Sequence, residues 1–202
     1  MTRQSLLVAT RNKGKLTELS QLLSDLPLLV CDLHSFPSIE TIKETGKTFT
    51  ENAVLKSAGY AAQTHMLTLA DDSGLEVEVL NGSPGVFSAR YAGDGATDED
   101  RINKLLKELS EFSEAERTAM FVSVAVIADA NGRIVNVSTG TCNGRIGLQP
   151  KGRNGFGYDP IFIPDGFEQS FAQISPAVKN QISHRARALA GSREFLRSLT
   201  AG

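Results

Sequence analysis

Two adjacent carboxylates, Asp71 and Asp72, follow the apolar run 66–70 and precede Ser73 and Gly74. The run is typical of a buried strand, and α/β proteins bind their ligands at the carboxyl ends of strands. Carboxylates hold Mg²⁺ and accept the proton of an attacking water. Neighbouring strand residues point to opposite faces, so one acid is expected to hold a metal or activate water and the other to cap a turn. An ordinary Asp-Asp turn is the alternative.

A basic turn lies between the first predicted strand and the first predicted helix. Backbone N–H groups and the dipole at a helix N-terminus attract anions. The segment is not a Walker A loop, because Ala9 stands in place of its first glycine and Leu16 in place of its Ser or Thr. A phosphate-binding turn and a plain basic surface turn are both consistent with this segment, which comprises Thr10, Arg11, Asn12, Lys13, Gly14 and Lys15.

A glycine-rich loop spans residues 151–158, and within it two glycines flank Phe156 and leave its ring uncrowded. Exposed aromatic rings stack on nucleobases. Asp159 adds an acceptor for a base N–H or a sugar hydroxyl. The pattern therefore favours a nucleobase site, and a turn with a core aromatic is the alternative.

Cationic residues gather near the last predicted helix. Lys179 precedes it, and Ser183 is the expected N-cap, which places His184 and Arg185 in the first turn. Cations there oppose the helix dipole, so the binding of an anion or a carbonyl oxygen would explain them. Simple exposure to solvent is the alternative.

The elements that must position these residues alternate between strand and helix. Apolar periodicity predicts strands over 6–9, 28–31, 66–72, 75–80, 119–130, 133–139 and 145–148, and helices over 16–26, 48–65, 97–109 and from 183 onward. Thr48 and Glu51 fit a capping box, and Asn131-Gly132 indicates a hairpin. This order indicates an α/β fold with a mixed sheet.

Bulk composition narrows the function classes. The chain has 202 residues, of which 41% are hydrophobic and 22% charged, as in a soluble globular protein with a single domain over 1–202. The net charge of −2 argues against nucleic-acid binding. No run reaches the length of a membrane helix, and the apolar N-terminal run is too short for a signal peptide. Cys31 and Cys142 lack zinc-ligand spacing, so we expect reduced thiols in the cytoplasm.

Six segments in order, taken together, closely resemble the Ham1/RdgB inosine triphosphate pyrophosphatase family. They are residues 8–15, 44–53, 70–75, 82–93, 155–160 and 183–185. The resemblance implies an elongated mixed central sheet with helices, in two lobes around a substrate cleft. It also implies a homodimer and Mg²⁺-assisted hydrolysis of ITP, dITP and XTP to the monophosphate and pyrophosphate, by attack of water at the α-phosphorus.

The family pattern also implies roles for individual residues. Asp72 is the expected general base and a metal-site residue, and Glu44 is the expected second metal acid, with Glu40 as its alternative. Glu51 is a further candidate from the acid cluster alone. Lys56 is expected to share phosphate charge with Lys13 and Lys15. The expected substrate contacts are the Thr10–Lys15 turn, Ser73, Phe156, Gly157, Tyr158, Asp159, Lys179, His184 and Arg185.

Hydrogen-bond polarity gives a reason for base selection. Hypoxanthine and xanthine present a 6-oxo acceptor where adenine presents a donor, so a site that aims donors there rejects adenine. Three other functions compete with this one: a Maf-like pyrophosphatase for other modified nucleotides, a nucleotide-binding regulator without turnover, and a phosphotransferase. The acid pair argues against the regulator, and the broken Walker pattern argues against the phosphotransferase.

Overall fold

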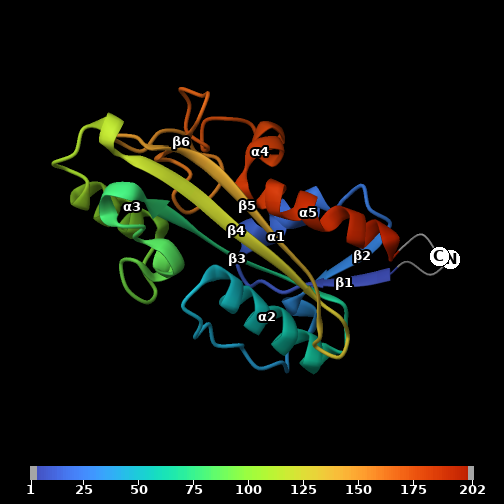
Figure 1. Ribbon diagram of the computed structural model, residues 1–202. Helices are drawn as coiled ribbons and strands as arrows, with labels where there is room; N and C mark the ends of the chain where they lie inside the picture. Colours follow the sequence, from blue (N-terminus) through green and yellow to red (C-terminus); the bar gives the residue numbers. More distant parts are fainter. Residues whose placement is uncertain (1–3, 200–202) are drawn as a thin grey trace. The chain divides into compact units, whose positions relative to one another are not determined.

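The structure, a computed structural model, describes residues 4–199, so the ends 1–3 and 200–202 of the expected domain lie outside the described residues. Strands and helices alternate in its first half, as the sequence predicts (Figure 1). The elements are β1 (Gln4–Val8), α1 (Lys13–Leu22), β2 (Leu28–Asp32), α2 (Phe49–Thr64), β3 (Thr68–Val77), α3 (Asp98–Glu108), β4 (Thr118–Ala128), β5 (Ile134–Ile146), β6 (Phe162–Pro164), α4 (Pro176–Ile182) and α5 (His184–Ser198). Short 3-10 helices cover Leu33–Ser35, Glu78–Leu80, Gly85–Arg90 and Glu114–Glu116.

One six-stranded sheet has the order β2-β1-β3-β4-β5-β6. β1 is parallel to β2 and to β3, and β5 is antiparallel to β6. A tight turn joins β4 to β5, in which the Gly132 N–H donates to the Asp129 carbonyl at 2.9 Å. The prediction of a mixed α/β sheet with a hairpin at Asn131-Gly132 is thus confirmed.

The chain divides into two compact units. Among the described residues, the first comprises 4–72, 123–140 and 185–199, and the second comprises 73–122 and 141–184. β3, β4 and β5 each contribute residues to both units.

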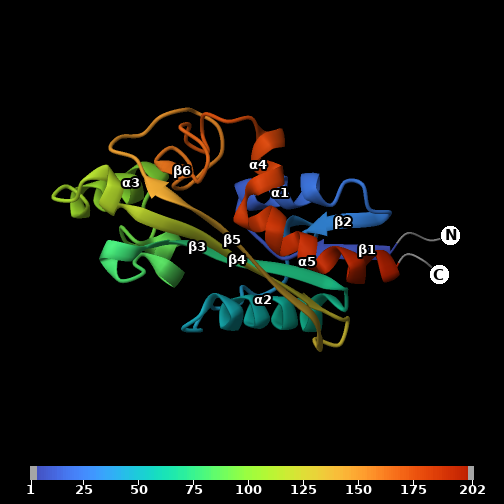
Figure 2. The same ribbon diagram turned by 45° about the horizontal axis from the view of Figure 1, so that its top comes forward.

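The first unit has helices on both faces of its strands. Leu6 and Val8 of β1 belong to a buried cluster that includes Leu19 of α1 and Leu189 of α5. The alternate residue Leu7 points the other way and belongs with Tyr60 of α2 to a second cluster. Figures 1 and 2 show the same arrangement, with α2 on one side of these strands and α1 and α5 on the other.

The second unit has an aromatic core. Phe121 of β4 lies edge-on to Phe162 of β6, with ring centroids 4.6 Å apart, and Phe171 lies 5.0 Å from Phe162. Leu105 of α3 and Leu75 of β3 are fully buried against this group. These residues give the second unit a core independent of the clusters in the first unit.

The acid pair does not end its strand, so the prediction of a turn there is wrong. β3 continues through Asp71 and Asp72 to Val77, and the strand is buried along nearly its whole length. Asp is unfavourable in strands and common in turns. Here basic side chains of the first unit compensate both charges, and Leu75 and Val77 carry the strand onward into the second core.

Two further differences concern strands and helices. The predicted strands 133–139 and 145–148 both overlap the single strand β5, which ends at Ile146. The predicted final helix is preceded by the short helix α4, with Ser183 between α4 and α5. The capping box at α2 is confirmed. The Thr48 hydroxyl accepts a hydrogen bond from the backbone N–H of Glu51, and the Glu51 carboxylate accepts one from the backbone N–H of Thr48.

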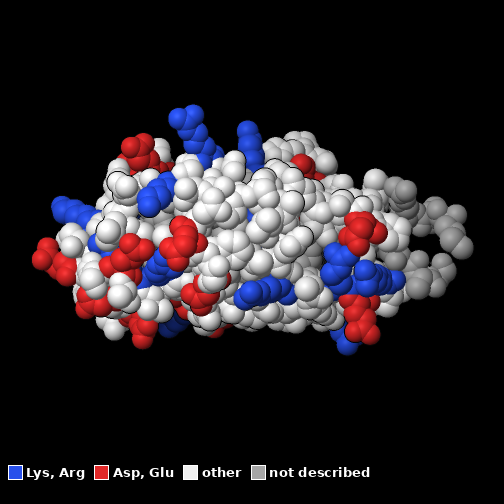
Figure 3. All heavy atoms as spheres, turned by 90° about the horizontal axis from the view of Figure 1, so that it is seen from above, with Lys and Arg blue, Asp and Glu red and all other residues white. Residues whose placement is uncertain are grey.

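Basic and acidic side chains are interspersed on the face shown in Figure 3. Among residues 4–199, no helix is both long enough and apolar enough to cross a membrane.

Candidate functional site

Five charged side chains of the first unit form what we call the acid–lysine cluster: Lys15, Glu44, Lys56, Asp71 and Asp72. Adjacent positions in β3 send the two aspartates to different partners, as strand geometry requires. Asp71 pairs with Lys15 from the first turn of α1, and Asp72 pairs with Lys56 from α2. The expectation that one of the two acids caps a turn is therefore wrong, because Asp71 forms ion pairs with Lys15 and Arg185 instead.

Asp71 is held as an ion among cations. Its side chain is fully buried, its Oδ2 lies 2.8 Å from Lys15 Nζ and 3.5 Å from Arg185 Nε, and its Oδ1 accepts a hydrogen bond from Ser123. Burial raises the pKa of Asp71, but the charges of Lys15 and Arg185 outweigh burial and hold the pKa below its ordinary value. A carboxylate engaged on both oxygens in this way is suited to holding cations rather than to accepting a proton.

Asp72 has the opposite electrostatic character. Its Oδ1 accepts from Lys56 Nζ at 2.8 Å, and its side chain is 8% exposed. Burial raises the pKa of Asp72 above its ordinary value, the nearby charge of Glu44 raises it further, and Lys56 only partly opposes them. A carboxylate with a raised pKa is the better proton acceptor of the two.

Three glutamates were candidates for the second metal acid, and their surroundings differ. Glu44 Oε1 lies 3.2 Å from Lys56 Nζ, the same ammonium that binds Asp72. Glu51 accepts from the backbone N–H groups of Lys47 and Thr48 in the capping box. Glu40 is exposed, and its backbone pairs with the Gln63 side chain. Of the three, Glu44 is the one that an ion pair places in the acid–lysine cluster.

The predicted phosphate turn lies where a strand meets a helix in the first unit. Asn12 caps α1 by accepting from the Lys15 N–H at 3.0 Å, and Thr10 Oγ1 accepts from the Asn12 N–H at 3.1 Å. Arg11 and Lys13 are exposed. Gly14 lies in the first turn of α1. The turn therefore presents a capped helix N-terminus with exposed basic side chains, the arrangement expected for anion binding.

Arg185 belongs to the first unit and is almost completely buried there. Its Nη1 donates to Glu18 of α1, and its Nε faces Asp71. The sequence grouped Arg185 with His184 and Lys179, whereas the structure places it among the charges around Asp71.

The second unit contains the predicted nucleobase residues. The half-buried Phe156 lies in a turn closed by Asp159, whose Oδ2 accepts from the Phe156 N–H at 2.8 Å. The buried Lys179 Nζ forms an ion pair with Asp159 and lies 5.3 Å from the centre of the Phe156 ring and 5.2 Å from that of Phe171. Asp159 and Lys179 thus hold the loop and the aromatic ring, which is a supporting arrangement.

Neighbouring residues fix the same loop. The Gly157 N–H donates to Asp98 Oδ2 at 2.7 Å, and the Tyr158 hydroxyl donates to the Ser88 carbonyl at 3.0 Å. Burial raises the pKa of Tyr158, so its hydroxyl stays protonated at neutral pH. Ser73, half-buried, is the first residue of the second unit along β3.

His184 is part of the aromatic core of the second unit. Its ring stacks on Phe121 with centroids 4.6 Å apart and an interplanar angle of 10°. Stacking fixes the plane of the imidazole, and with it the directions in which its nitrogens can form hydrogen bonds.

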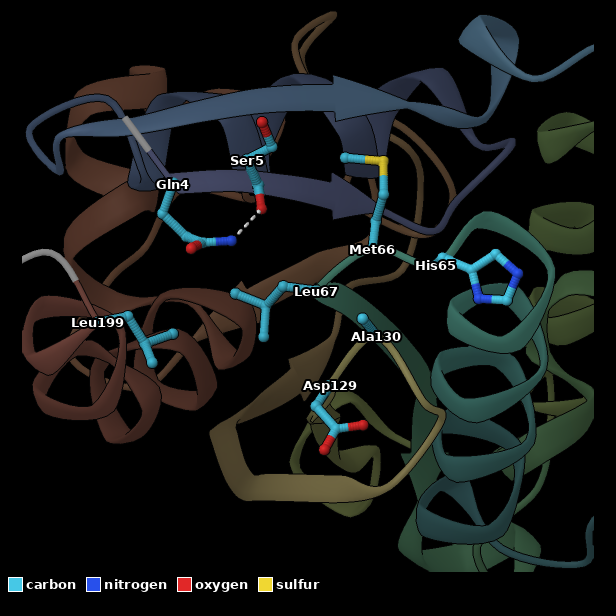
Figure 4. A pocket seen from close by; sticks show the side chains of 8 residues that line it. All are labelled: Gln4, Ser5, His65, Met66, Leu67, Asp129, Ala130 and Leu199. Carbon is cyan, nitrogen blue, oxygen red and sulfur yellow. Dashed lines mark hydrogen bonds between the residues drawn. The ribbon is translucent and has the colours of Figure 1, made fainter. Parts of the chain in front are cut away.

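A cavity of about 280 Å³ in the first unit contains none of the predicted site residues (Figure 4). It lies at the starts of β1 and β3 and near the β4–β5 turn, whereas the acid pair lies further along β3. Its lining residues are Gln4, Ser5, His65, Met66, Leu67, Asp129, Ala130 and Leu199. Chemistry therefore points to the acid–lysine cluster rather than to this cavity.

Three residues that support the site were not predicted from the sequence. Ser123, Glu18 and Asp98 contact Asp71, Arg185 and the Gly157 N–H, respectively. Ser123 does carry one signal, since it is the only polar residue between Ala119 and Ala128. A buried hydroxyl in an apolar strand needs a partner, although the sequence does not say which.

The acid–lysine cluster supplies hard oxygen ligands but no complete cage. Among residues 4–199, no group of three or more His, Cys, Asp or Glu side chains is arranged to hold a metal ion. Mg²⁺ is commonly bound by only one or two protein carboxylates, with phosphate and water completing its shell. Asp72 and Glu44, both close to Lys56 Nζ, fit that pattern.

Comparison with known proteins shows similarity over nearly the whole chain. The Ham1 family pattern matches residues 6–195. A dITP/XTP pyrophosphatase of Bacillus anthracis is 46% identical over 190 residues, covering 92% of this chain and 93% of that protein. A dITP/XTP pyrophosphatase of Coxiella burnetii is 43% identical over 185 residues, covering 91% of this chain and 92% of that protein.

Solved structures agree with the sequence comparison. The Ham1 protein of Staphylococcus aureus superposes with a TM-score of 0.84 at 39% identity, covering 97% of this chain and all of that one. A HAM1 protein of Coxiella burnetii superposes with a TM-score of 0.85 at 40% identity, covering 98% of this chain and 100% of that one. The resemblance seen in the six sequence segments is thus confirmed, and the chain belongs to the Ham1 family.

Proposed function

We propose that this protein hydrolyses non-canonical purine nucleoside triphosphates, dITP, ITP and XTP, to the monophosphate and pyrophosphate. Membership of the Ham1 family and two relatives named dITP/XTP pyrophosphatase support the activity. The observation that carries the chemistry is the acid–lysine cluster, in which the buried Asp71 lies against Lys15 and Arg185 while Asp72 shares the Lys56 ammonium with Glu44. The two neighbouring acids therefore have different surroundings, one among cations and the other beside a second carboxylate.

In the proposed mechanism, Asp72 accepts a proton from the water that attacks the α-phosphorus, and pyrophosphate leaves. Lys15 and the N-terminus of α1 stabilise the phosphate oxygens. Lys13 is exposed in the same turn and adds positive charge. Lys56 orients Asp72 through their hydrogen bond of 2.8 Å. Catalysis then consists of positioning and electrostatic stabilisation.

Magnesium is the proposed cofactor, with Asp72 and Glu44 as its protein ligands. Both carboxylates lie close to Lys56 Nζ, at 2.8 Å and 3.2 Å, and a hard divalent cation would compete with that ammonium for their oxygens. When bound, Mg²⁺ neutralises charge on the phosphate oxygens and on the pyrophosphate leaving group.

We assign recognition of the base and sugar to the second unit. Phe156 offers a ring for stacking, and Asp159 and Lys179 hold its loop. His184 is the proposed donor toward the 6-oxo group, since its ring plane is fixed against Phe121. A base with a 6-amino group would face this donor with a donor of its own, and a buried mismatch of that kind is strongly rejected.

The remaining expectations are part of the same proposal. A single domain over residues 1–202 acts as a homodimer in the cytoplasm, and size-exclusion chromatography with light scattering would measure the oligomeric state.

Product analysis tests the function directly. Purified protein is incubated with Mg²⁺ and dITP, XTP, ITP, ATP or GTP, and pyrophosphate and orthophosphate are measured separately. We expect pyrophosphate from the first three and little product from ATP, whose 6-amino group faces a donor. Little product is also expected from GTP, whose 2-amino group must be rejected separately because guanine shares the 6-oxo group. Release of orthophosphate, or equal rates on ATP, would contradict the proposal.

A further inference from the structure

Ser123 is a buried hydroxyl inside an apolar strand. It has no exposed surface, and the residues on either side of it in β4, from Ala119 to Ala128, are apolar. Its Oγ donates to Asp71 Oδ1. A hydrogen bond to an ionised carboxylate is stronger than one between neutral groups. The contact therefore fixes the rotation of the Asp71 carboxylate.

The other oxygen of Asp71 holds the cations. With Oδ1 engaged by Ser123, Oδ2 lies 2.8 Å from Lys15 Nζ and 3.5 Å from Arg185 Nε. A lysine ammonium stands on a flexible stem of four carbons, so its position depends on what binds it. Here Asp71 supplies that anchor.

Arg185 is held from a second side. Its Nη1 pairs with Glu18, three residues after Lys15 in α1. Glu18, Arg185, Asp71 and Lys15 thus form a row of alternating charges, and Ser123 adds a neutral donor at Asp71. Removal of that donor takes away one of the contacts that orient the carboxylate, and so weakens the constraint on Lys15.

We propose that Ser123 is a positioning residue: through Asp71 it sets where Lys15 holds its ammonium, and so how well the protein binds the phosphates of its substrate. The inference rests on the proposed function and extends it to a residue that touches no substrate. It predicts that Ser123 matters only as long as residue 15 carries a charge.

A double-mutant cycle tests this coupling. The proteins are wild type, Ser123→Ala, Lys15→Met and the double variant, and the readouts are kcat/KM for dITP with Mg²⁺ and the Kd of pyrophosphate by calorimetry. We expect Ser123→Ala to lower kcat/KM about tenfold when it is made in the wild-type protein and less than about twofold when it is made in the Lys15→Met variant. The reason is that the effects of substitutions at residues of one contact network do not add. Pyrophosphate affinity should change in parallel.

Matched variants separate positioning from general stability. Ser138→Ala removes another hydroxyl of the first unit, which donates to the Ala188 carbonyl at 2.7 Å, and should leave kcat/KM unchanged. Ser123→Cys keeps a weak donor of similar size and should give an intermediate loss, and it replaces the alanine variant if that fails to fold.

Equal losses from Ser123→Ala in both residue-15 backgrounds would overturn the inference. Failure of the proposed function would look different, as wild-type protein that releases no pyrophosphate from dITP. Coupling in the pyrophosphate Kd would then still decide the role of Ser123, because that measurement needs no turnover.

Discussion

Asp72→Asn tests the proposed role of Asp72 as the general base separately from its part in the ion pairs of the cluster. In the wild type, Lys56 Nζ lies 2.8 Å from Asp72 Oδ1 and 3.2 Å from Glu44 Oε1. The carboxamide of the variant keeps an oxygen that can accept the same hydrogen bond from Lys56, and the ion pair between Lys56 and Glu44 remains. Packing around a side chain that is 8% exposed changes little, since Asn and Asp have nearly the same shape. What is lost is the negative charge, and with it the ability to accept a proton from water and one charged ligand of the proposed Mg²⁺ site, so rates are compared at saturating Mg²⁺.

The expected loss of rate is that of an enzyme without its general base. Loss of a general base costs about 10²- to 10⁴-fold in rate, which corresponds to about 3–5.5 kcal/mol in the activation free energy. The free energy of unfolding should increase slightly or stay unchanged. Burial raises the pKa of Asp72, so its ionised form costs folding free energy at neutral pH, and a neutral side chain relieves that cost.

Asp71→Asn is the matched comparison, and it should differ from Asp72→Asn by lowering the free energy of unfolding. The pKa of Asp71 lies below the ordinary 3.8, so its charge stabilises the fold at neutral pH and that contribution is lost as pH falls below this value. Its removal leaves Lys15 and Arg185 without their shared carboxylate. Breaking a buried pair in this way typically costs about 3–5 kcal/mol of unfolding free energy.

Initial rates of pyrophosphate release from dITP, with thermal unfolding followed by circular dichroism, measure both effects. Asp72→Asn should keep the wild-type Tm and lose turnover. Asp71→Asn should have a lower Tm than the wild type. Near-normal turnover in a folded Asp72→Asn protein would refute the assignment of the base.

Three other predictions concern binding. Phe156→Ala should weaken the binding free energy of dITP by about 1–3 kcal/mol, the value of one base stacked on an aromatic ring, as calorimetry would measure. Gly155→Ala should lower Tm and weaken dITP binding, because at φ +74° a Cβ atom would lie 1.9 Å from Asp159 Oδ2; an unchanged Tm in a scanning experiment would contradict the described loop. Glu44→Gln should raise the Mg²⁺ concentration for half-maximal rate by about tenfold, the lower end of what losing a partner at a metal site costs, with little change in kcat at saturating Mg²⁺.

Controls for these variants come from the same chain. Phe87→Ala removes a ring that is 57% exposed in the second unit and should leave the Kd of dITP unchanged. Glu40→Gln neutralises an exposed acid that lies outside the acid–lysine cluster and should not change the Mg²⁺ requirement. A shift in Kd or Mg²⁺ requirement in either control equal to that of its partner would contradict the assigned site.

Local patterns were sufficient to predict much of the fold. The apolar run from Leu6 to Ala9 predicts the buried strand β1, and the Thr48–Glu51 capping box begins α2. Both features depend on residues close together in the sequence. The continuation of β3 through Asp71 and Asp72 could not be predicted, because it depends on ion pairs with Lys15 and Lys56 from distant segments.

The same distinction holds for the site. The pair Asp71–Asp72 and the ring of Phe156 were candidates because their residue types and neighbours suggest chemistry, and the choice of Asp72 within the pair is what the family resemblance implies. Their support was not predictable, since Ser123 reaches Asp71 across 52 positions and Asp98 reaches Gly157 across 59. Arg185 follows His184 directly, yet the two belong to different units, a separation that sequence adjacency conceals.

Attack at the α-phosphorus is the central claim, and hydrolysis of dITP in ¹⁸O-labelled water tests it most directly. Mass spectrometry of the products should find one ¹⁸O atom in the phosphate of deoxyinosine monophosphate and none in pyrophosphate. Label in pyrophosphate would place the attack at the β-phosphorus, and label in released orthophosphate would place it at the γ-phosphorus. Either result would contradict the proposed mechanism.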